Sequence, residues 1–258
     1  MRKYEQYKGY LIDLDGTAYR GTELIPETLA FVKQLHEANI PYLFLTNNST
    51  KTPAMAAEIL ANFGYPVTSA QVYTSSIATA SYIHEQKPGA KIYIIGEIGL
   101  KTELEAKGFE LVNSGADADY VVMGLDRAIT YEKLTEACIG VRGGAKFVVT
   151  NEDRALPTER GFIPGNGAMA SVVATSTGIA PVYIGKPNAI IMDFALAEIG
   201  LQASEVAMVG DNYHTDILAG INSGLPAIFI EGGVSSRADV LSYEKQPTHI
   251  LKDLTELL

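Results

Sequence analysis

The chain has 258 residues, enough for one large domain or two moderate ones, and its 47% hydrophobic content excludes a globally disordered protein. The formal net charge of −10, with no block of Lys and Arg, argues against nucleic acid and anionic membrane surfaces as partners. The single cysteine, Cys138, allows no intramolecular disulfide, and no segment reaches the roughly 18 apolar residues of a membrane span. Residues 1–10 lack the apolar core of a signal peptide, so we expect a soluble cytoplasmic protein.

Short apolar runs alternate with helical patterns along the chain. A strand predicted at 9–12 is followed by a helix at 26–38, which has Pro at its first position, and by a strand at 42–45. Later strands are predicted at 91–95, 120–123, 146–149, 182–184, 206–209 and 227–230, and later helices at 188–199 and 215–223. This alternation is typical of parallel βαβ units, so we predict an α/β fold with a Rossmann-like parallel-sheet core.

The middle of the chain carries strands and helices of its own, including KIYIIG, ADYVVMGLD and AKFVVTNED. We therefore predict that residues 1–76 and 181–258 form the core domain. Residues 77–180 are predicted to form a smaller α/β cap domain, inserted into the core.

Four predicted strands lead directly into polar residues, in YLIDLDGT, PYLFLTNNST, PVYIGKPN and VAMVGDNYHTD. In an open parallel sheet the carboxyl ends of the strands meet at one crevice, where ligands bind. Each segment alone could be an ordinary strand-to-turn junction. All four in this order indicate a functional site at one edge of the sheet.

The first of these segments carries two carboxylates, Asp13 and Asp15. A carboxylate at a strand end can be a nucleophile toward a phosphoryl group. Asp15 would share a face with Asp13 in a continuing strand, and it could protonate the leaving oxygen and later deprotonate water. Gly16 allows a close backbone approach. The alternative is that both aspartates only cap a turn.

Carboxylates alone would repel a phosphate, and a hard divalent cation removes this repulsion by bridging them. We predict Mg²⁺, held by Asp13, the backbone carbonyl of Asp15, and Asp211. Asp216 is predicted to lie beside these ligands, where it would orient waters or Lys186. An aspartate in the first turn of a helix is also favourable without any function. The ligand types do not separate Mg²⁺ from Mn²⁺.

The second and third segments supply candidate phosphate-binding groups. Lys186 offers a fixed positive charge to the nucleophile and to the developing phosphoryl charge, and Thr46 and Asn47 could hold the transferring oxygens. Each has a simpler alternative, because a lysine is usually a solvated surface residue and Thr46 and Asn47 could cap the helix that follows.

In this order DLDGT, LTNNS, GKP and GDNYHTD resemble the four motifs of haloacid-dehalogenase-type phosphatases. The resemblance implies the roles given above, with Asp13 forming an aspartyl-phosphate intermediate. Many dehalogenases of this superfamily lack the second aspartate of the first motif, so Asp15 favours a phosphatase.

The inserted segment resembles the NagD-like branch, through VVMGLDRAITYEKL and FVVTNEDRALPTERGFIPGNGA. Members of this branch carry a large α/β cap and hydrolyse small phosphomonoesters, including phosphorylated sugar acids and nitrophenyl phosphate. The resemblance implies an acid sugar phosphatase with a small phosphorylated metabolite as its substrate. Polar residues after two strands of the cap could face the substrate, although ordinary loop polarity explains them at least as well: Asn151, Asp153, Arg154, Asp126 and Arg127.

Two other functions fit the same residues. A phosphomutase or phosphotransferase would pass the phosphoryl group from Asp13 to a hydroxyl instead of water, and a non-catalytic switch would keep it. Asp15 argues against the switch, which has less need of an acid and base beside its phosphoaspartate. The sequence leaves the oligomeric state open, although a surface of the cap could pair two subunits.

Overall fold

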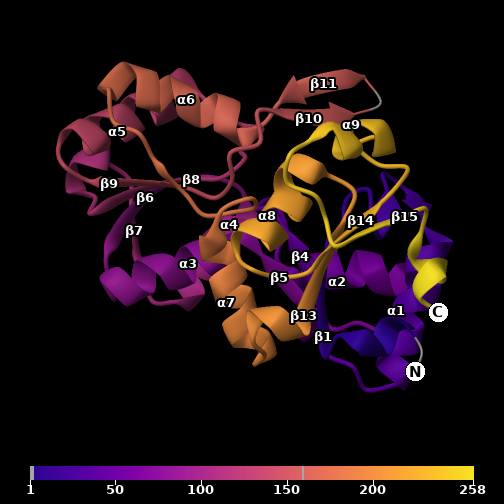
Figure 1. Cartoon of the computed structure of the whole chain (residues 1–258). Coiled ribbons are helices and arrows are strands. Elements are labelled where there is room, and N and C mark those ends of the chain that lie inside the picture. The colour runs from indigo at the N-terminus through magenta and orange to yellow at the C-terminus, as the bar shows by residue number, and fades with distance from the viewer. Residues whose placement is uncertain (1–2, 159) are drawn as a thin grey trace. The chain divides into compact units, whose positions relative to one another are not determined.

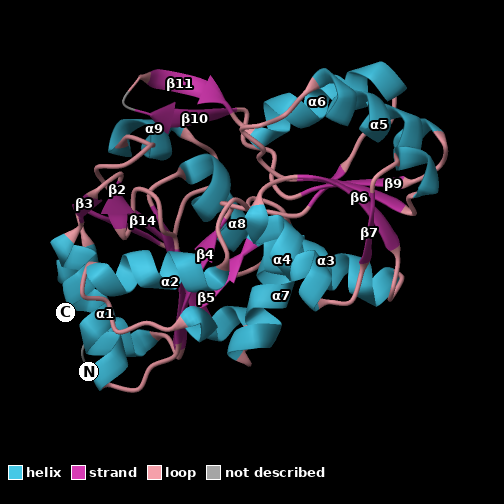
Figure 2. Cartoon of the chain, turned by 180° about the vertical axis from the view of Figure 1, so that it is seen from behind, coloured by secondary structure: helices cyan, strands magenta, loops and turns pink. Residues whose placement is uncertain are grey.

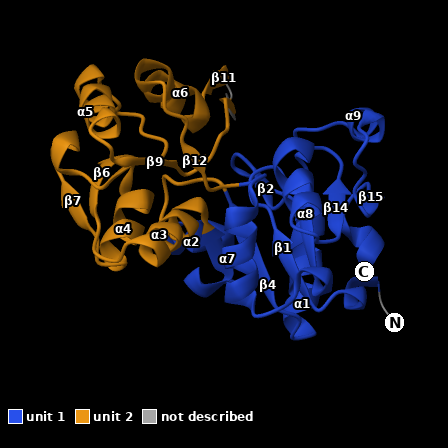
Figure 3. Cartoon of the chain, turned by 60° about the vertical axis from the view of Figure 1, so that its left-hand side comes forward, with its two compact units in different colours: residues 1–46, 53–73, 186–258 blue, residues 47–52, 74–185 orange. Residues whose placement is uncertain are grey.

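The computed structural model describes residues 3–158 and 160–258 and divides into two compact units (Figure 3). Unit 1 comprises residues 1–46, 53–73 and 186–258, and unit 2 comprises residues 47–52 and 74–185. The domain boundaries predicted from the sequence, after residues 76 and 180, remain a proposal. In the described part of the chain, no helix has both the length and the apolar character that crossing a membrane requires.

Unit 1 is built on a sheet with the strand order β15-β14-β13-β1-β4-β5 (Figure 1). The central strand β1 pairs in parallel with both β13 and β4. The strands of this sheet are β1 (Gly9–Ile12), β4 (Tyr42–Thr46), β5 (Val72–Thr74), β13 (Val206–Gly210), β14 (Ala227–Ile230) and β15 (His249–Leu251). A separate antiparallel pair consists of β2 (Tyr19–Arg20) and β3 (Glu23–Leu24).

Helices cover both faces of this sheet. Figures 1 and 2, which view the chain from opposite sides, show α7 and α8 on one face and α1 and α2 on the other. Because neither face meets water, β1, β4, β13 and β14 are buried along their whole length and are largely apolar, with Thr46 at the end of β4 as a polar exception. The helices of unit 1 are α1 (Pro26–Glu37), α2 (Pro53–Asn62), α7 (Ala189–Ile199), α8 (Leu218–Asn222) and α9 (Arg237–Ser242).

Unit 2 contains a second parallel sheet, with the order β12-β9-β8-β6-β7. Its strands are β6 (Lys91–Ile95), β7 (Glu110–Val112), β8 (Tyr120–Met123), β9 (Lys146–Val149) and β12 (Val182–Tyr183), and a hairpin is formed by β10 (Ala155–Thr158) and β11 (Gly161–Pro164). Its helices are α3 (Ser75–Gln86), α4 (Ile98–Ala106), α5 (Tyr131–Arg142) and α6 (Asn166–Thr177). Apolar residues of α5 and α6 pack with β6, β8 and β9 in one core cluster.

Short helical turns connect several of these elements. They comprise the 3₁₀ helices Lys3–Gln6, Ser69–Gln71, Gly115–Asp117, Ala203–Glu205 and Leu254–Leu257, and a π-helical turn at Tyr213–Ile217.

The predicted α/β fold is confirmed, because both large sheets are parallel and flanked by helices. One expectation about the sheets is wrong. The strand before Lys186 was expected to end at the core sheet, but β12 pairs with β9 in the sheet of unit 2. Only three of the four polar segments therefore follow strands of the core sheet. A strand of two residues carries too little pattern to show which sheet it joins.

Candidate active site

Asp13 lies immediately after β1, at the carboxyl end of the central strand. Its backbone N–H donates to the carbonyl of Val209 over 2.9 Å, which holds it beside the end of β13. Its side chain is buried, whereas Asp15 is exposed and its backbone forms an isolated bridge with Tyr19. The strand thus ends before Asp13, so the two carboxylates do not share a strand face.

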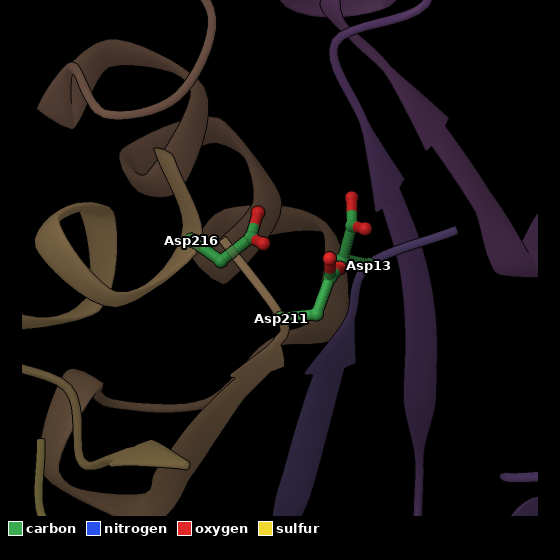
Figure 4. A group of neighbouring side chains, drawn as sticks. All are labelled: Asp13, Asp211 and Asp216. Atoms are coloured by element: carbon green, nitrogen blue, oxygen red, sulfur yellow. The ribbon is translucent and has the colours of Figure 1, made fainter. Parts of the chain in front are cut away.

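Asp211 and Asp216 are contributed by the end of β13 and by the turn that follows it. Asp211 comes directly after Gly210, the last residue of β13, and Asp216 lies in the π-helical turn. Both are fully buried, at 0% and 1% exposure. One carboxylate oxygen from each of Asp13, Asp211 and Asp216 lies within 4.8 Å of the others, and Figure 4 shows the three side chains directed toward a common region.

Lys186 joins two of these carboxylates. Its Nζ lies 2.5 Å from Asp13 Oδ1 and 2.8 Å from Asp216 Oδ1, and it also donates to the Leu45 carbonyl over 2.9 Å. The residue is 1% exposed, so the expectation of a solvated surface lysine does not apply. These three acceptors match the three N–H donors of an ammonium group, which fixes the position of the charge.

Asp211 is held by two hydrogen-bond donors, Thr17 and Val234, that the sequence pattern did not indicate. Its Oδ1 accepts from the Thr17 hydroxyl over 3.0 Å, and its Oδ2 accepts from the Val234 N–H over 2.7 Å. A Cβ at Gly16 would lie 2.5 Å from Asp211 Oδ2, and a Cβ at Gly233 would overlap the same carboxylate. Two features of the sequence could have indicated these contacts: Thr17 at the end of DLDGT and the glycine pair of EGGV.

The concentration of acids raises their pKa values. Burial raises the pKa of Asp13 well above its ordinary value, with a further increase from the Asp216 carboxylate that Lys186 partly offsets. Burial, followed by the Asp216 charge, raises the pKa of Asp211 to about 6. Burial opposes the charge on Lys186, but Asp13 and Asp216 outweigh it and raise the pKa of the ammonium group. Lys186 therefore stays charged.

The donor set fits a hard divalent cation. Three buried carboxylates face one buried ammonium group, so they carry an excess of negative charge that burial makes costly. Oxygen-only donors at this spacing can hold a divalent metal ion. Asp216 differs from Asp211 in its direct contact with the ammonium group, because its Oδ1 contacts Lys186 while its Oδ2 accepts from the Asn212 N–H over 3.1 Å.

The two residues after the apolar part of β4 fall in different units. Thr46 is the last residue of β4 and is buried in unit 1. Asn47 belongs to unit 2, where its Nδ2 donates to Asp153 Oδ2 over 3.0 Å. Asn151 Nδ2 donates to the same oxygen over 2.5 Å. The side chains of Asn151 and Asp153 thus hydrogen-bond to each other and to Asn47, all within unit 2.

Comparison with known proteins supports one family over nearly the whole chain. Residues 10–110 match the family model described as haloacid dehalogenase-like hydrolase, and residues 183–257 match one described as HAD-hydrolase-like. An acid sugar phosphatase of Staphylococcus epidermidis is 52% identical over 250 residues, which cover 97% of this chain and 96% of the relative. The 5'-nucleotidase YutF of Bacillus subtilis is 50% identical over 250 residues, 97% of each chain.

A solved structure agrees with these sequence matches. The p-nitrophenyl phosphatase from Archaeoglobus fulgidus is 35% identical, with a TM-score of 0.93 and 98% of both chains covered. Its similarity extends over both the core and the inserted segment. The chain belongs to the haloacid dehalogenase-like hydrolases, in the NagD-like branch, and is a phosphoric monoester hydrolase.

Proposed function

We propose that this protein is a Mg²⁺-dependent phosphatase of small phosphomonoesters, such as sugar or sugar-acid phosphates, with Asp13 as its nucleophile. The observation that carries the proposal is the contact of Lys186 Nζ with both Asp13 and Asp216, beside Asp211. It gathers the residues of the first, third and fourth motifs around one buried point. The names of the relatives, acid sugar phosphatase and p-nitrophenyl phosphatase, support the substrate class.

In the first half-reaction, an oxygen of the Asp13 carboxylate attacks phosphorus, and the bond between phosphorus and the leaving oxygen breaks. Asp15 donates a proton to that oxygen, which departs as an alcohol. Asp13 then carries the phosphoryl group as a mixed anhydride. Lys186 stabilises the charge on the phosphoryl oxygens, and Thr46 and Asn47 are proposed to bind them.

In the second half-reaction, Asp15 takes a proton from water, and the water oxygen attacks phosphorus. The bond to Asp13 breaks, which releases inorganic phosphate and regenerates the carboxylate. Mg²⁺ bound by Asp13, Asp211 and the backbone carbonyl of Asp15 would neutralise phosphate charge. Asp216 holds Lys186 in place through its 2.8 Å contact. The exposure of Asp15 is suited to a group that must exchange protons with both an alcohol and water.

A substrate panel tests the proposal. Release of inorganic phosphate from p-nitrophenyl phosphate, glucose 6-phosphate and 6-phosphogluconate is measured with Mg²⁺ and with EDTA. We expect turnover only with the metal, loss of turnover in Asp13→Asn, and full turnover in Asp193→Asn, an exposed aspartate of α7. Undiminished turnover by Asp13→Asn would falsify the nucleophile assignment. An isomerised or transferred phosphate ester in place of free phosphate would favour the mutase or transferase.

We also propose that the protein works in the cytoplasm on a small metabolite, without nucleic acid or membrane partners. The single cysteine and the net charge of −10 support this placement. Whether it forms a homo-oligomer is tested by measuring its molar mass in solution.

A further inference from the structure

Arg20 lies on the short hairpin of β2 and β3, which begins four residues after Asp15. It is the second residue of β2, opposite Glu23 of β3. The residue before it, Tyr19, accepts a hydrogen bond from the Gly16 N–H over 2.8 Å through its carbonyl. Burial, followed by the charges of Asp15 and Asp13, raises the pKa of the Tyr19 hydroxyl, and a hydrogen bond between the Tyr19 side chain and Asp15 adds to this shift. The backbone position of Arg20 is therefore fixed to the segment that carries the proposed general acid.

The side chain of Arg20 reaches the loop that holds Asp211. A methyl group in place of hydrogen at Gly232 would lie 2.8 Å from Arg20 Nη2, so the guanidinium lies against this glycine. The next residue, Gly233, packs on the Asp211 carboxylate, and Val234 donates its N–H to it. Arg20 thus belongs to the segment that follows Asp15, and its side chain contacts the loop that packs on Asp211.

The charge of Arg20 is available to a ligand. In the described part of unit 1, no acceptor forms a hydrogen bond or ion pair with its guanidinium, although Glu23 is its cross-strand neighbour. Glu231, the acid of the adjoining loop, pairs with Arg237 over 2.5 Å. Lys186, the buried cation of the site, is already bound by Asp13, Asp216 and the Leu45 carbonyl.

We propose that Arg20 binds an oxyanion, a carboxylate or a second phosphate, on the leaving group and thereby selects such substrates over phosphomonoesters whose leaving group is uncharged. The inference rests on the proposed phosphatase function. A leaving group with its own negative charge would otherwise meet a site rich in aspartates in a chain with a net charge of −10. The planar fork of a guanidinium matches the two oxygens of such a group. Arg20 is exposed, so it can meet a group that projects beyond the buried aspartates.

The test uses substrates that differ only in the presence of the anion. 6-Phosphogluconate is compared with sorbitol 6-phosphate, and 3-phosphoglycerate with glycerol 3-phosphate, because each pair replaces a carboxylate by a CH₂OH group. A sugar bisphosphate is added to distinguish a second phosphate from a carboxylate. Each compound is assayed as a substrate and as a competitive inhibitor of p-nitrophenyl phosphate hydrolysis, so a compound that is not turned over still reports binding.

We expect the wild type to prefer the acid in at least one pair. In Arg20→Gln this preference should fall about ten-fold, the change that corresponds to the loss of one charge-assisted hydrogen bond. The change should appear in KM with little change in kcat, because the leaving-group anion is bound equally in the ground and transition states. Arg20→Lys should retain part of the preference, since it keeps the charge but not the fork.

Lys33→Gln is the matched control, because it removes one exposed positive charge from α1 of the same unit. It should leave the preference unchanged, which separates recognition by Arg20 from the effect of net charge. The inference would be overturned if the wild type used or bound the acid and the alcohol of each pair equally well. It would also be overturned if Arg20→Gln kept the wild-type preference for the acid. Failure of the wild type to hydrolyse p-nitrophenyl phosphate at all would instead overturn the proposed function.

Discussion

At the scale of single residues, the candidate site depends on one buried ammonium group. Lys186 contacts Asp13 and Asp216 from a position with 1% exposure. Without Lys186, the buried carboxylates of Asp13 and Asp216 would lose the positive charge that offsets part of the cost of burying them. The lysine is therefore expected to support folding as well as catalysis.

We predict that Lys186→Met abolishes phosphate release and lowers the free energy of unfolding by about 3 kcal/mol at pH 7.5 without metal. Urea denaturation followed by circular dichroism measures the second effect. Lys8→Met is the matched control, because Lys8 forms a 2.5 Å ion pair with Glu205 but its side chain is 70% exposed. An exposed pair contributes about 0–1 kcal/mol, so this variant should be nearly as stable as the wild type. Equal losses in both variants would contradict the assigned role of burial.

At the scale of elements, short polar segments after buried strands build the site. The loop between β14 and α9 illustrates this arrangement, because it carries Gly233 and Val234 against Asp211. Gly233 allows the close approach, since any larger residue would place a Cβ inside the Asp211 carboxylate. A loop that fixes a metal-binding carboxylate is expected to control how tightly the metal is held.

We predict that Gly233→Ala raises the Mg²⁺ concentration needed for half-maximal activity about ten-fold or more, because Asp211 must move. The measurement is phosphate release over a Mg²⁺ titration. Gly143→Ala serves as the control, since Gly143 has φ −72° at the end of α5 and its nearest added contact would be 3.2 Å away. A normal Mg²⁺ requirement in Gly233→Ala would show that Asp211 tolerates the displacement.

At the scale of the whole molecule, the acidic site links stability to pH. The pKa of Asp211 is raised from 3.8 to about 6, chiefly by burial. The folded metal-free protein therefore binds a proton more tightly than the unfolded chain does. This contribution to stability is fully present below pH 3.8 and is lost as the pH rises to about 6.

We predict that, in EDTA, the contribution of Asp211 to the free energy of unfolding falls by on the order of 3 kcal/mol between pH 4 and pH 7. The measurement is the difference in urea stability between the wild type and Asp211→Asn at each pH. Mg²⁺ competes with protons for the same oxygens, so it should raise the Tm more at pH 7.5 than at pH 5. Parallel pH profiles of the two proteins would rule out this linkage.

Much of the fold follows from local patterns in the sequence. The predicted strands at 9–12, 91–95, 120–123, 146–149 and 227–230 have these bounds in the structure. Each is a mostly apolar run, although β6 and β9 begin with an exposed lysine, and burial on both faces of a parallel sheet favours that pattern. The hairpin of β10 and β11 was not predicted, because β11 is exposed along its length and carries no apolar alternation.

The sequence by itself determined which residue types stand at the ends of strands, and hence the proposal of Asp13, Lys186, Asp211 and Asp216 as one set. Only the tertiary structure decided that β12 belongs to the second sheet, that Asp15 is exposed while Asp13 is buried, and that Asn47 binds Asp153. The physical reason is the distance along the chain over which each feature is decided. Strand and turn preferences depend on near neighbours, whereas sheet membership, burial and the contact of Arg20 with Gly232 depend on residues far apart in the chain.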